Sequence, residues 1–462
     1  MIEKLFQKQK ENSLRLRSSN AHERKINLTV FKQMILQNQG LIYQSLWQDF
    51  SKPETESYLT EIYPLLTEID FALKNINDWV KQKNVATPIS LGCGRSWIKY
   101  EPKGTSLIVA PWNYPVLLAL SPIVSALAAG CTVILKPSEI STHTSLTLKK
   151  LIAMHFPEQL IAVVEGGLEE TTQLLQLPFD HIFFTGSTEV GKIFMQAAAQ
   201  NLSSLTLELG GKSPVIVDSS ADLKLAAQKI AWGKLINAGQ TCIAPDYLFI
   251  EESIWPTFKT LLTATFEKYY PASSNLKDLA QIINVKHLQR LESMIQEAYE
   301  TGAEFIAGGK VDHQQRKIYP TILKISHQQC KMMQEEIFGP ILPVMTYKSL
   351  NEVIHYINQN PKPLSLYLFA NDQKVIEDIL TKTSSGGVCI NEVLLHLANH
   401  NLPFGGVNHS GIGHYHGYFG FKAFSHEKAV YQQSRFGRLF MFLYPPYSLE
   451  KLKWLKIIMR FF

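Results

Sequence analysis

One thiol, Cys242, stands among residue types that suit nucleophilic chemistry. It lies in WGKLINAGQTCIAPD (232–246), with Gly239 three residues before it and Pro245 three residues after it. Glycine tolerates backbone angles and close approaches that a side chain would block, so this bend can present the thiol to a substrate. A thiolate attacks carbonyl carbons. The alternative is a buried structural cysteine, the commonest state of a lone free cysteine.

Two further groups upstream suit the same chemistry. Glu208 stands in LELGGKSP (207–214), beside two glycines, where partial desolvation would suit it as a general base for water. The alternative for Glu208 is a surface carboxylate on a strand edge. Asn113, in PWNYP (111–115), can donate its amide N–H to an oxyanion, together with the backbone N–H of Cys242.

Histidine is the other common base beside a thiol. The chain has 14 histidines, and five of them gather near the C-terminus: His396, His400, His409, His414 and His416. Nearness in sequence does not place any of them beside the thiol. We expect His414 and His416 to be structural or to line the substrate mouth.

An alternation of strands and helices would position these groups. Continuous apolar strands are expected at 104–110, 132–135, 161–164 and 181–184, and helices follow them. Strand, turn and helix repeated in this way predict a doubly wound parallel sheet, whose ligands lie beyond the carboxyl ends of the strands. Those ends carry Asn113, Lys136, Glu139 and Gly186.

The alternation begins again after residue 211. Strands are expected at 214–217, 246–250, 304–306, 343–346 and 387–390. The fold class is therefore α/β, with two doubly wound Rossmann-like domains and a small β bridging element. We expect a cofactor domain (1–85 and 103–209), a catalytic domain (210–397), a bridging segment (86–102 and 398–426) and a tail (427–462).

The first 85 residues are expected to be helical, because apolar positions recur at spacings of three and four. The sequence Ser51-Lys52-Pro53 ends one helix, and Glu54 begins another. Nothing in this region carries obvious chemistry, so we expect a structural role.

The loop TGSTEVG (185–191) is a candidate phosphate site. Gly186, Ser187 and Gly191 open a helix directly after a strand, and backbone amides at such a helix start bind phosphate oxygens. The motif is weak alone, since it lacks the G-x-G-x-x-G fingerprint. Lys136 and Glu139, on a neighbouring strand end, strengthen it, because they can hold ribose hydroxyls or a phosphate.

These motifs together resemble the aldehyde dehydrogenase family. At least six of them occur in the expected order between about residues 104 and 429. GSTEVG, AWGK…NAGQTCIAPDY, PFGGVNHSGIGHYHG and the closing FSH are similar to the class 3 branch, which includes fatty and aromatic aldehyde dehydrogenases. Asn408 departs from the glycine usual in that branch.

The resemblance implies a mechanism and a cofactor. Cys242 would form a thiohemiacetal and then a thioester, which Glu208 would help to hydrolyse, with Glu336 as the second candidate base. Lys136 and Glu139 would bind the dinucleotide. NAD is favoured over NADP, because Glu139 would repel a 2′-phosphate.

The stretch QEEIFGP (334–340) would complete the cofactor site. The resemblance places Glu336 at the nicotinamide ribose and Phe338 near the nicotinamide ring. Taken alone, an acid pair of this kind is more often a solvated helix face. Tyr114, next to Asn113, is expected in the substrate pocket.

Composition excludes several other classes of protein. A net charge of +5 over 462 residues gives little support to nucleic-acid binding. The five cysteines include no CxxC pair and no Cys/His cluster, so neither a metal site nor a disulfide framework is expected. Because signal-peptide and membrane-spanning segments are lacking, we expect a cytoplasmic protein.

The C-terminal tail carries a basic amphipathic pattern. Lys453, Lys456 and Arg460 share one helical stripe, opposite Leu452, Leu455, Met459 and Phe462. Such a helix can lie on an anionic membrane surface, but it is too short and charged to span one. The equal alternative is docking on its own subunit or gating the substrate mouth. The resemblance implies a homodimer paired through the bridging segment.

Three functions remain to be weighed. The first is NAD(P)-dependent oxidation of hydrophobic medium- or long-chain, or aromatic, aldehydes to carboxylic acids. A CoA-acylating enzyme is disfavoured, because Glu208 serves hydrolysis. A non-catalytic membrane-associated scaffold would be expected to lack Asn113, Glu208 or Cys242, and all three are present.

Overall fold

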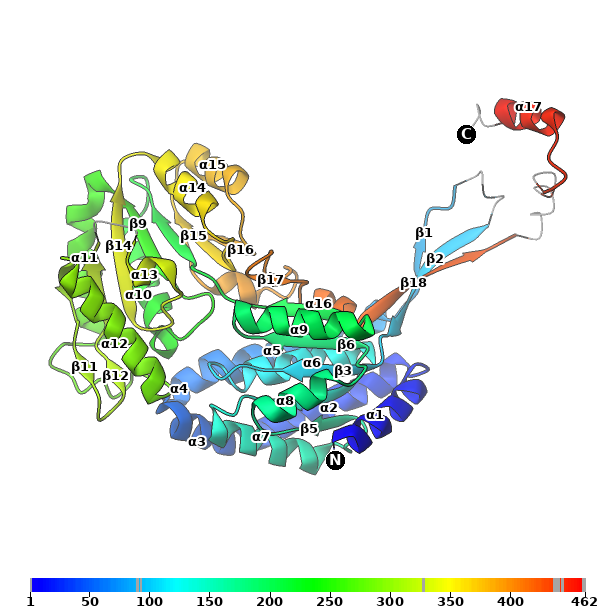
Figure 1. The fold of residues 1–462 in the computed structure, drawn as a ribbon, viewed down its shortest axis with the longest axis horizontal. Coiled ribbons are helices and arrows are strands. Elements are labelled where there is room, and N and C mark those ends of the chain that lie inside the picture. Colours follow the sequence, from blue (N-terminus) through cyan, green and yellow to red (C-terminus); the bar gives the residue numbers. More distant parts are fainter. Residues whose placement is uncertain are drawn as a thin grey trace.

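The computed structural model describes residues 2–88, 91, 94–325, 329–434, 441 and 444–458. Two largely parallel sheets form the body of the molecule, and a three-stranded antiparallel sheet projects from it (Figure 1). The predicted α/β class with two Rossmann-like sheets and a small β element is confirmed.

The first sheet has the strand order β17-β7-β6-β3-β4-β5. Its strands are β3 (Thr105–Val109), β4 (Thr132–Lys136), β5 (Ile161–Val163), β6 (His181–Thr185), β7 (Ser204–Glu208) and β17 (Gly411–Ile412). All neighbours are parallel except β17, which pairs antiparallel with β7. Residues 411–412, expected in the bridging segment, therefore extend this sheet.

Helices cover both faces of the first sheet. One face packs against α1 (Ile2–Leu16), α8 (Leu168–Leu175) and α9 (Thr188–Asn201). The other packs against α2 (Ala21–Gln37), α5 (Tyr63–Trp79), α6 (Leu117–Ala129) and α7 (Thr142–His155). Strands β3, β4 and β6 are thus buried on both faces, which explains their continuous apolar runs in the sequence.

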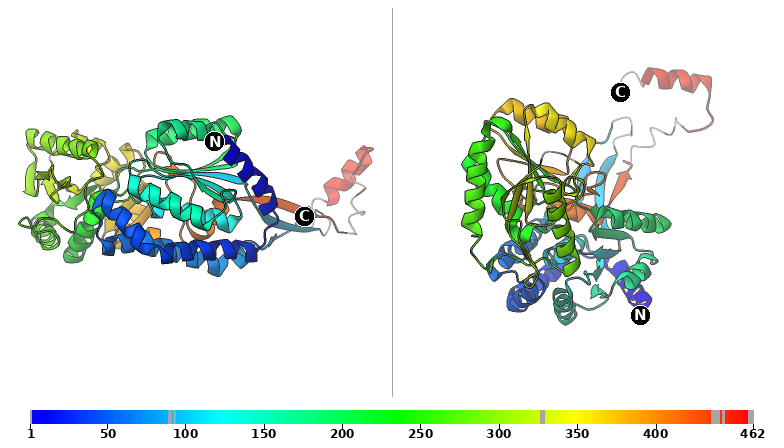
Figure 2. Two further views of the ribbon diagram at one scale, coloured as in Figure 1. Left: turned by 90° about the horizontal axis from the view of Figure 1, so that it is seen from below. Right: turned by 60° about the vertical axis from the view of Figure 1, so that its left-hand side comes forward.

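Helices α2, α3 (Gln39–Phe50) and α5 form a layer on one side of the molecule, whereas α1 lies apart from it on the other face of the first sheet (Figure 2). Helix α3 ends before Ser51, and α4 (Glu54–Ser57) begins after Pro53, as predicted. A π-helical turn, η1 (Tyr58–Ile62), joins α4 to α5.

The second sheet has the order β10-β13-β14-β9-β8-β15-β16. Its strands are β8 (Pro214–Val217), β9 (Tyr247–Glu251), β10 (Glu304–Ala307), β13 (Thr321–Lys324), β14 (Ile341–Tyr347), β15 (Ser365–Phe369) and β16 (Gly387–Ile390). The helices around it are α10 (Leu223–Leu235), α11 (Trp255–Tyr269), α12 (Val285–Glu300), α13 (Lys331–Gln334), α14 (Leu350–Gln359) and α15 (Gln373–Lys382). The short strands β11 (Val311–Asp312) and β12 (Lys317–Ile318) form a separate ribbon.

The small sheet consists of β1 (Lys83–Val85), β2 (Arg95–Pro102) and β18 (Ser425–Gln432). β18 follows the short helix α16 (Gly417–Ala423) and runs past residue 427, where the tail was expected to begin.

Helix α17 (Leu449–Ile458) lies beyond the tip of the small sheet, away from the body (Figure 1). Three residues of the expected amphipathic pattern, Met459, Arg460 and Phe462, fall outside the described residues. Among the described helices, none is both long and apolar enough to cross a bilayer.

Candidate active site

The loop that carries Cys242 begins where α10 ends. A 3-10 turn (Ile236–Gly239) follows the helix, and Asn237, Ala238 and Gly239 all have left-handed backbone angles, with φ of +52°, +52° and +72°. A Cβ atom on Gly239 would lie 2.3 Å from the carbonyl oxygen of Gly339. Glycine was predicted here for its tolerance of backbone angles and of close approach, and both are confirmed.

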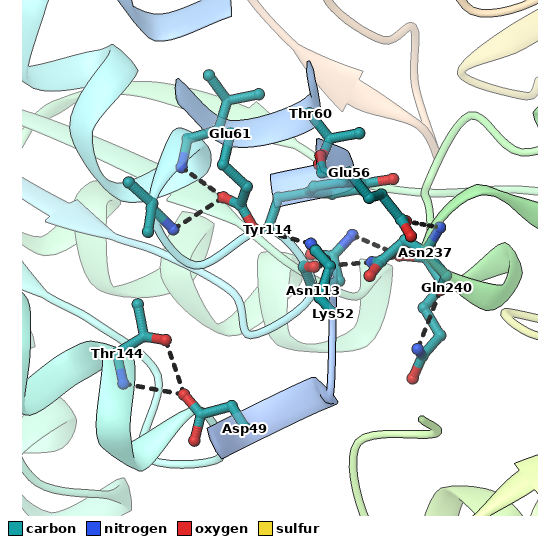
Figure 3. A network of polar contacts seen from close by, with 12 residues as sticks. Asp49, Lys52, Glu56, Thr60, Glu61, Asn113, Tyr114, Thr144, Asn237 and Gln240 are labelled. Atoms are coloured by element: carbon teal, nitrogen blue, oxygen red, sulfur yellow. Dashed lines mark hydrogen bonds and ion pairs between the residues drawn. The ribbon is translucent and has the colours of Figure 1, made fainter. Parts of the chain in front are cut away.

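Asn113 reaches this loop from the end of β3. Its Nδ2 donates to the carbonyl of Gln240 at 3.1 Å, and Asn237 Nδ2 donates back to the Asn113 carbonyl at 2.8 Å (Figure 3). The Tyr114 hydroxyl lies 2.7 Å from the Thr241 hydroxyl. Asn113 and Tyr114, which follow a strand of the first sheet, are therefore hydrogen-bonded to the loop after α10, a helix of the second sheet.

A cavity of about 290 Å³ opens beside the thiol. Its lining comes from both sheets: Pro111, Trp112, Asn113, Leu118, Thr185, Gly186, Ser187, Leu209, Gly210, Cys242, His287, Arg290, Glu336 and Phe338. The cavity thus gathers six of the eleven residues singled out in the sequence. Five others lie outside its lining: Tyr114, Lys136, Glu139, Gly191 and Glu208.

Glu208 ends β7 and is 2% exposed. Its carbonyl oxygen accepts the Gly186 N–H at 3.0 Å. Neither carboxyl oxygen has a hydrogen-bond partner within the described part of the chain, and burial raises the pKa of Glu208 well above its usual value. The surface-carboxylate alternative is therefore wrong, and the side chain is a desolvated acid whose charge acts on Cys242.

Glu336 is a second buried acid, and it lines the cavity. A Cβ atom on Gly210 would lie 2.4 Å from Glu336 Oε2, so only glycine admits the carboxyl group there. Burial, and then the charge of Asp246, raise the pKa of Glu336 to about 8. The solvated-helix alternative is wrong for this residue also.

The loop that carries Glu336 and Phe338 is held by Arg290, which also lines the cavity, and by Asp246. Arg290 donates to the carbonyls of Glu336 and Ile337 at 3.1 and 2.5 Å. Asp246 Oδ1 accepts the Ile337 N–H at 2.9 Å. Phe338 itself has a φ of +54°, an unfavourable angle for a bulky residue that persists only where the surroundings fix it.

The charges of both acids affect the pKa of the Cys242 thiol. Burial, then the charges of Glu336 and Glu208, raise its pKa to about 12. The thiol is therefore protonated at neutral pH in this structure, and it must lose its proton when a reaction begins.

The cofactor side lies at the ends of β4 and β6. Lys136 is 2% exposed; its Nζ donates to the Pro137 carbonyl at 2.9 Å and lies 3.4 Å from Glu139 Oε2. The Glu139 carboxylate is 56% exposed. An ammonium has three donors, so Lys136 retains one for a ligand.

The phosphate-site loop has the predicted form. β6 runs into Gly186 and Ser187, and α9 begins at Thr188 with Ser187 as its N-cap. A Cβ atom on Gly186 would lie 2.5 Å from the Phe184 ring, so this position requires glycine. Gly186 and Ser187 line the cavity. Together with Lys136 and Glu139, this loop fits a dinucleotide.

Several cavity residues were missed in the sequence: Trp112, Thr185, Gly210, His287 and Arg290. Trp112, Thr185 and Gly210 lie within motifs that the sequence analysis quoted, so adjacency was a usable signal. His287 and Arg290 lie on α12, outside every motif. No local sequence pattern indicates that these two residues line the cavity.

Two of the C-terminal histidines, His400 and His416, lie beside an acid, while His396 contacts Ser365 and Cys389. His400 Nδ1 and His416 Nδ1 lie 2.7 and 3.3 Å from Glu68 Oε2. Although burial opposes it, hydrogen bonds from His400 and His416 hold the pKa of Glu68 at about 2. These three side chains also lie close enough to hold a metal ion, but the hydrogen bonds to one carboxylate account for their arrangement.

The fold and the cavity define a two-sheet α/β enzyme, in which Glu208 ends a strand of the first sheet and Cys242 and Glu336 lie in loops that lead into β9 and β14 of the second. Residues 1–430 match the Aldehyde dehydrogenase family, and the chain belongs to that family. It is an NAD(P)-dependent aldehyde dehydrogenase, an oxidoreductase, and the predicted kinship with the class 3 branch is confirmed.

Relatives of known name lie close in sequence and structure. "4,4'-diaponeurosporen-aldehyde dehydrogenase" of Staphylococcus aureus is 46% identical over 89% of this chain and 90% of the relative. "Aldehyde dehydrogenase, dimeric NADP-preferring" of Rattus norvegicus is 43% identical over 88% and 89%. The solved structure "Substrate bound state of Staphylococcus Aureus AldH" superposes with a TM-score of 0.95 at 43% identity, covering 99% of both chains.

Proposed function

We propose that this enzyme oxidises hydrophobic aldehydes, either medium- or long-chain aliphatic or aromatic, to carboxylic acids through a thioester on Cys242. One observation carries the proposal. Cys242 and Asn113 line the same cavity as Glu336 and Phe338, although they come from distant parts of the chain.

In the acylation step, Cys242 Sγ forms a bond to the aldehyde carbon and gives up its proton. The aldehyde oxygen becomes an oxyanion, and the Asn113 amide together with the Cys242 backbone N–H would donate to it. One Nδ2 hydrogen of Asn113 is directed to the Gln240 carbonyl, which leaves the other for the substrate. Loss of one such donor costs roughly 2.7–4 kcal/mol of barrier.

NAD(P)⁺, when bound, accepts the hydride that leaves the tetrahedral carbon. Lys136, Glu139, Ser187 and the backbone of Gly186 and Gly191 would hold the dinucleotide. Glu336 and Phe338 would contact its nicotinamide end. The exposed Glu139 carboxylate supports NAD over NADP, since it would repel a 2′-phosphate.

In the deacylation step, Glu208 would take a proton from water, whose oxygen attacks the thioester carbon and releases Cys242 and the acid. Burial raises the pKa of Glu208, which makes its ionised form a stronger base than an exposed carboxylate. Glu336 is the second candidate. The presence of Glu208 also argues against transfer of the acyl group to CoA.

The nature of the substrate rests on the apolar lining and on kinship. Pro111, Trp112, Leu118 and Phe338 contribute the apolar walls of the cavity. Tyr114 would border the substrate side. The Staphylococcus aureus relative is named for 4,4'-diaponeurosporen-aldehyde, which supports a large hydrophobic aldehyde here.

The assembly we propose is a cytoplasmic homodimer. β18 is an eight-residue strand at the edge of the small sheet, and β16 is an edge strand of the second sheet. Long open edges invite strand pairing with another chain. A relative named as dimeric supports this assembly. The proposed domains remain 1–85 with 103–209, 210–397, and 86–102 with 398–426.

The test is NADH or NADPH formation at 340 nm with hexanal, decanal and benzaldehyde, for the wild type and Cys242→Ala. We expect activity that increases with chain length, prefers NAD⁺ and is abolished in the variant. Absence of activity with every aldehyde and both cofactors would refute the proposal. Activity only with added CoA would establish the acyl-transfer alternative.

A further inference from the structure

Glu56 connects the N-terminal helical layer to the loop of Cys242. It lies in α4, directly before the π-helical turn η1. Its Oε1 accepts the backbone N–H of Asn237 at 2.5 Å, across 181 positions of sequence (Figure 3). π-Helical turns are rare and are frequent at functional sites. The N-terminal region, expected to be only structural, therefore contacts the loop that carries the thiol.

The Glu56 carboxylate binds the loop where its backbone conformation is unfavourable. Asn237 and Ala238 have φ/ψ of 52°/29° and 52°/35°, both left-handed. Left-handed backbone is unfavourable for residues with a Cβ atom and persists where neighbouring groups hold it. The Glu56 carboxylate accepts the hydrogen bond from the Asn237 N–H just after α10 ends.

Asn237 also hydrogen-bonds to the backbone of Asn113 and of Gln240, which lies two residues before Cys242. Its Nδ2 donates to the carbonyls of Asn113 and Gln240, at 2.8 and 3.1 Å. The same Gln240 carbonyl accepts the Asn113 amide at 3.1 Å. One side chain thus fixes Asn113 relative to Gln240, two residues before Cys242. A shift of Asn237 would move the oxyanion donor and the thiol apart.

We propose that Glu56 is a positioning residue for the acylation step, acting through Asn237 on Asn113 and Cys242. The inference rests on the proposed function for the roles of Asn113 and Cys242. It adds a residue that touches neither substrate nor cofactor.

The charges around Glu56 support a specific role for its carboxylate. Lys52 and Glu61 form a fully buried ion pair at 2.9 Å, so the nearest cation is already balanced. Tyr114 and Tyr270 also face Glu56. Burial and, more weakly, Glu61 raise the pKa of Glu56, while Lys52 and the Asn237 N–H oppose the rise.

The ionised form should hold the loop more firmly, because charge-assisted hydrogen bonds are shorter and stronger than neutral ones. We therefore expect the acylation rate to fall as the pH drops through the pKa of Glu56. Glu56→Gln keeps an oxygen acceptor of the same reach but no charge. It should retain most of the rate and lose this part of the pH profile.

The experiment measures two properties of full-length enzyme. The first is the single-turnover rate of NADH formation with hexanal and NAD⁺ from about pH 4.5 to 9, a range that begins at the ordinary pKa of a glutamate. The second is the rate of Cys242 alkylation by iodoacetamide, followed by mass spectrometry. The variants are Glu56→Ala, Glu56→Asp and Glu56→Gln, with Glu54→Ala, an exposed acid on the same helix, as the matched control.

We expect Glu56→Ala to slow NADH formation roughly 10- to 100-fold, the cost of a displacement of about 1 Å, with KM for NAD⁺ unchanged. Its Cys242 alkylation rate should also change. Glu56→Gln should stay within about threefold at high pH, and Glu54→Ala should match the wild type. Glu56→Asp, which is too short to reach Asn237, replaces Glu56→Ala if that variant does not fold.

Wild-type rates in Glu56→Ala or Glu56→Asp, for both NADH formation and alkylation, would overturn the inference. A uniform loss in all three Glu56 variants, without a change in the pH profile, would also overturn it, because that pattern indicates only destabilisation. A wild type that oxidises no aldehyde, but whose thiol alkylation depends on Glu56, would refute the proposed function and leave the positioning role standing.

Discussion

At the scale of the residue, two buried acids near one thiol invite separate tests. Glu208 has no hydrogen-bond partner for either oxygen within the described residues, whereas the carboxyl of Glu336 packs on Gly210 and receives the backbone N–H of Gly211. The carboxyl without partners is the better placed to accept a proton from water. The loop of Glu336, fixed by Arg290, is suited to holding a ligand.

We predict that Glu208→Gln will form the thioester but release it slowly. Rapid mixing with aldehyde and NAD⁺ should show a burst of about one NADH per thiol, because acylation does not need this base. The steady rate should then fall by roughly 10²- to 10⁴-fold, the usual contribution of a general base. Mass spectrometry should detect the acylated Cys242. If the thioester accumulates in Glu336→Gln instead, then Glu336 is the base.

The reactivity of the thiol should depend on the charge of Glu336. Burial and the charges of Glu336 and Glu208 raise the pKa of Cys242 to about 12. Because the pKa of Glu336 is about 8, its charge is present above pH 8 and is lost below it. Glu336→Gln removes this charge at every pH. It should therefore lower the pKa of Cys242 at the pH values at which Glu336 is ionised in the wild type.

We therefore predict that iodoacetamide will alkylate Cys242 faster in Glu336→Gln than in the wild type, and that the difference will grow above pH 8. The measurement is the alkylation rate from pH 6 to 10, without cofactor. Glu335→Gln, the adjacent exposed acid, is the control. Equal rates in the wild type and Glu336→Gln at pH 9.5 would contradict the assigned charge coupling.

At the scale of the element, the turn after α10 depends on a glycine. Gly239→Ala would put a Cβ atom 2.3 Å from the Gly339 carbonyl at a φ of +72°. The Gly339 carbonyl belongs to the backbone and cannot rotate away, so the two loops must move apart. We predict a loss of about 1–3 kcal/mol in the free energy of unfolding, together with slower acylation.

Chemical denaturation and single-turnover NADH formation check this prediction. Gly40→Ala in α3 is the matched control, because its Cβ atom would meet nothing within 4 Å; stability should change by less than about 1 kcal/mol. Wild-type acylation in Gly239→Ala would show that the position of the thiol does not need this turn.

The elements also show what a sequence can and cannot predict. Strand β6 was predicted to within one residue, and a helix was expected after its glycine turn, because an apolar run and a glycine turn are local signals. The ion pair of Lys212 with Asp246 was not predicted, although both residues stand in quoted motifs. It depends on β8 lying next to β9, and no local pattern encodes strand order. The contact of Glu56 with Asn237 was missed for the same reason.

At the scale of the whole molecule, the tail is the part least tied to the body. Leu449, Trp454 and Ile457 on α17 are 80%, 59% and 50% exposed, beside Lys453 and Lys456. Exposed apolar groups flanked by lysines favour an anionic lipid surface. The alternative is that the helix gates the substrate mouth of its own or a partner subunit.

We predict that the full chain will bind vesicles of phosphatidylserine and phosphatidylcholine, and that a chain ending at Ser434 will not. Each lysine near such a surface contributes about 1 kcal/mol, so Lys451, Lys453 and Lys456 together should strengthen binding roughly 100-fold over neutral vesicles, and salt should weaken it. Cosedimentation measures the binding, and hexanal oxidation by both chains in buffer is the control. Unchanged hexanal kinetics with lost vesicle binding would assign the helix to the membrane. Equal vesicle binding by both chains would contradict that assignment. An altered KM for hexanal in the shortened chain would also contradict it and would favour a gate over the substrate mouth. A membrane contact has no reason to alter the capture of a small aldehyde in solution.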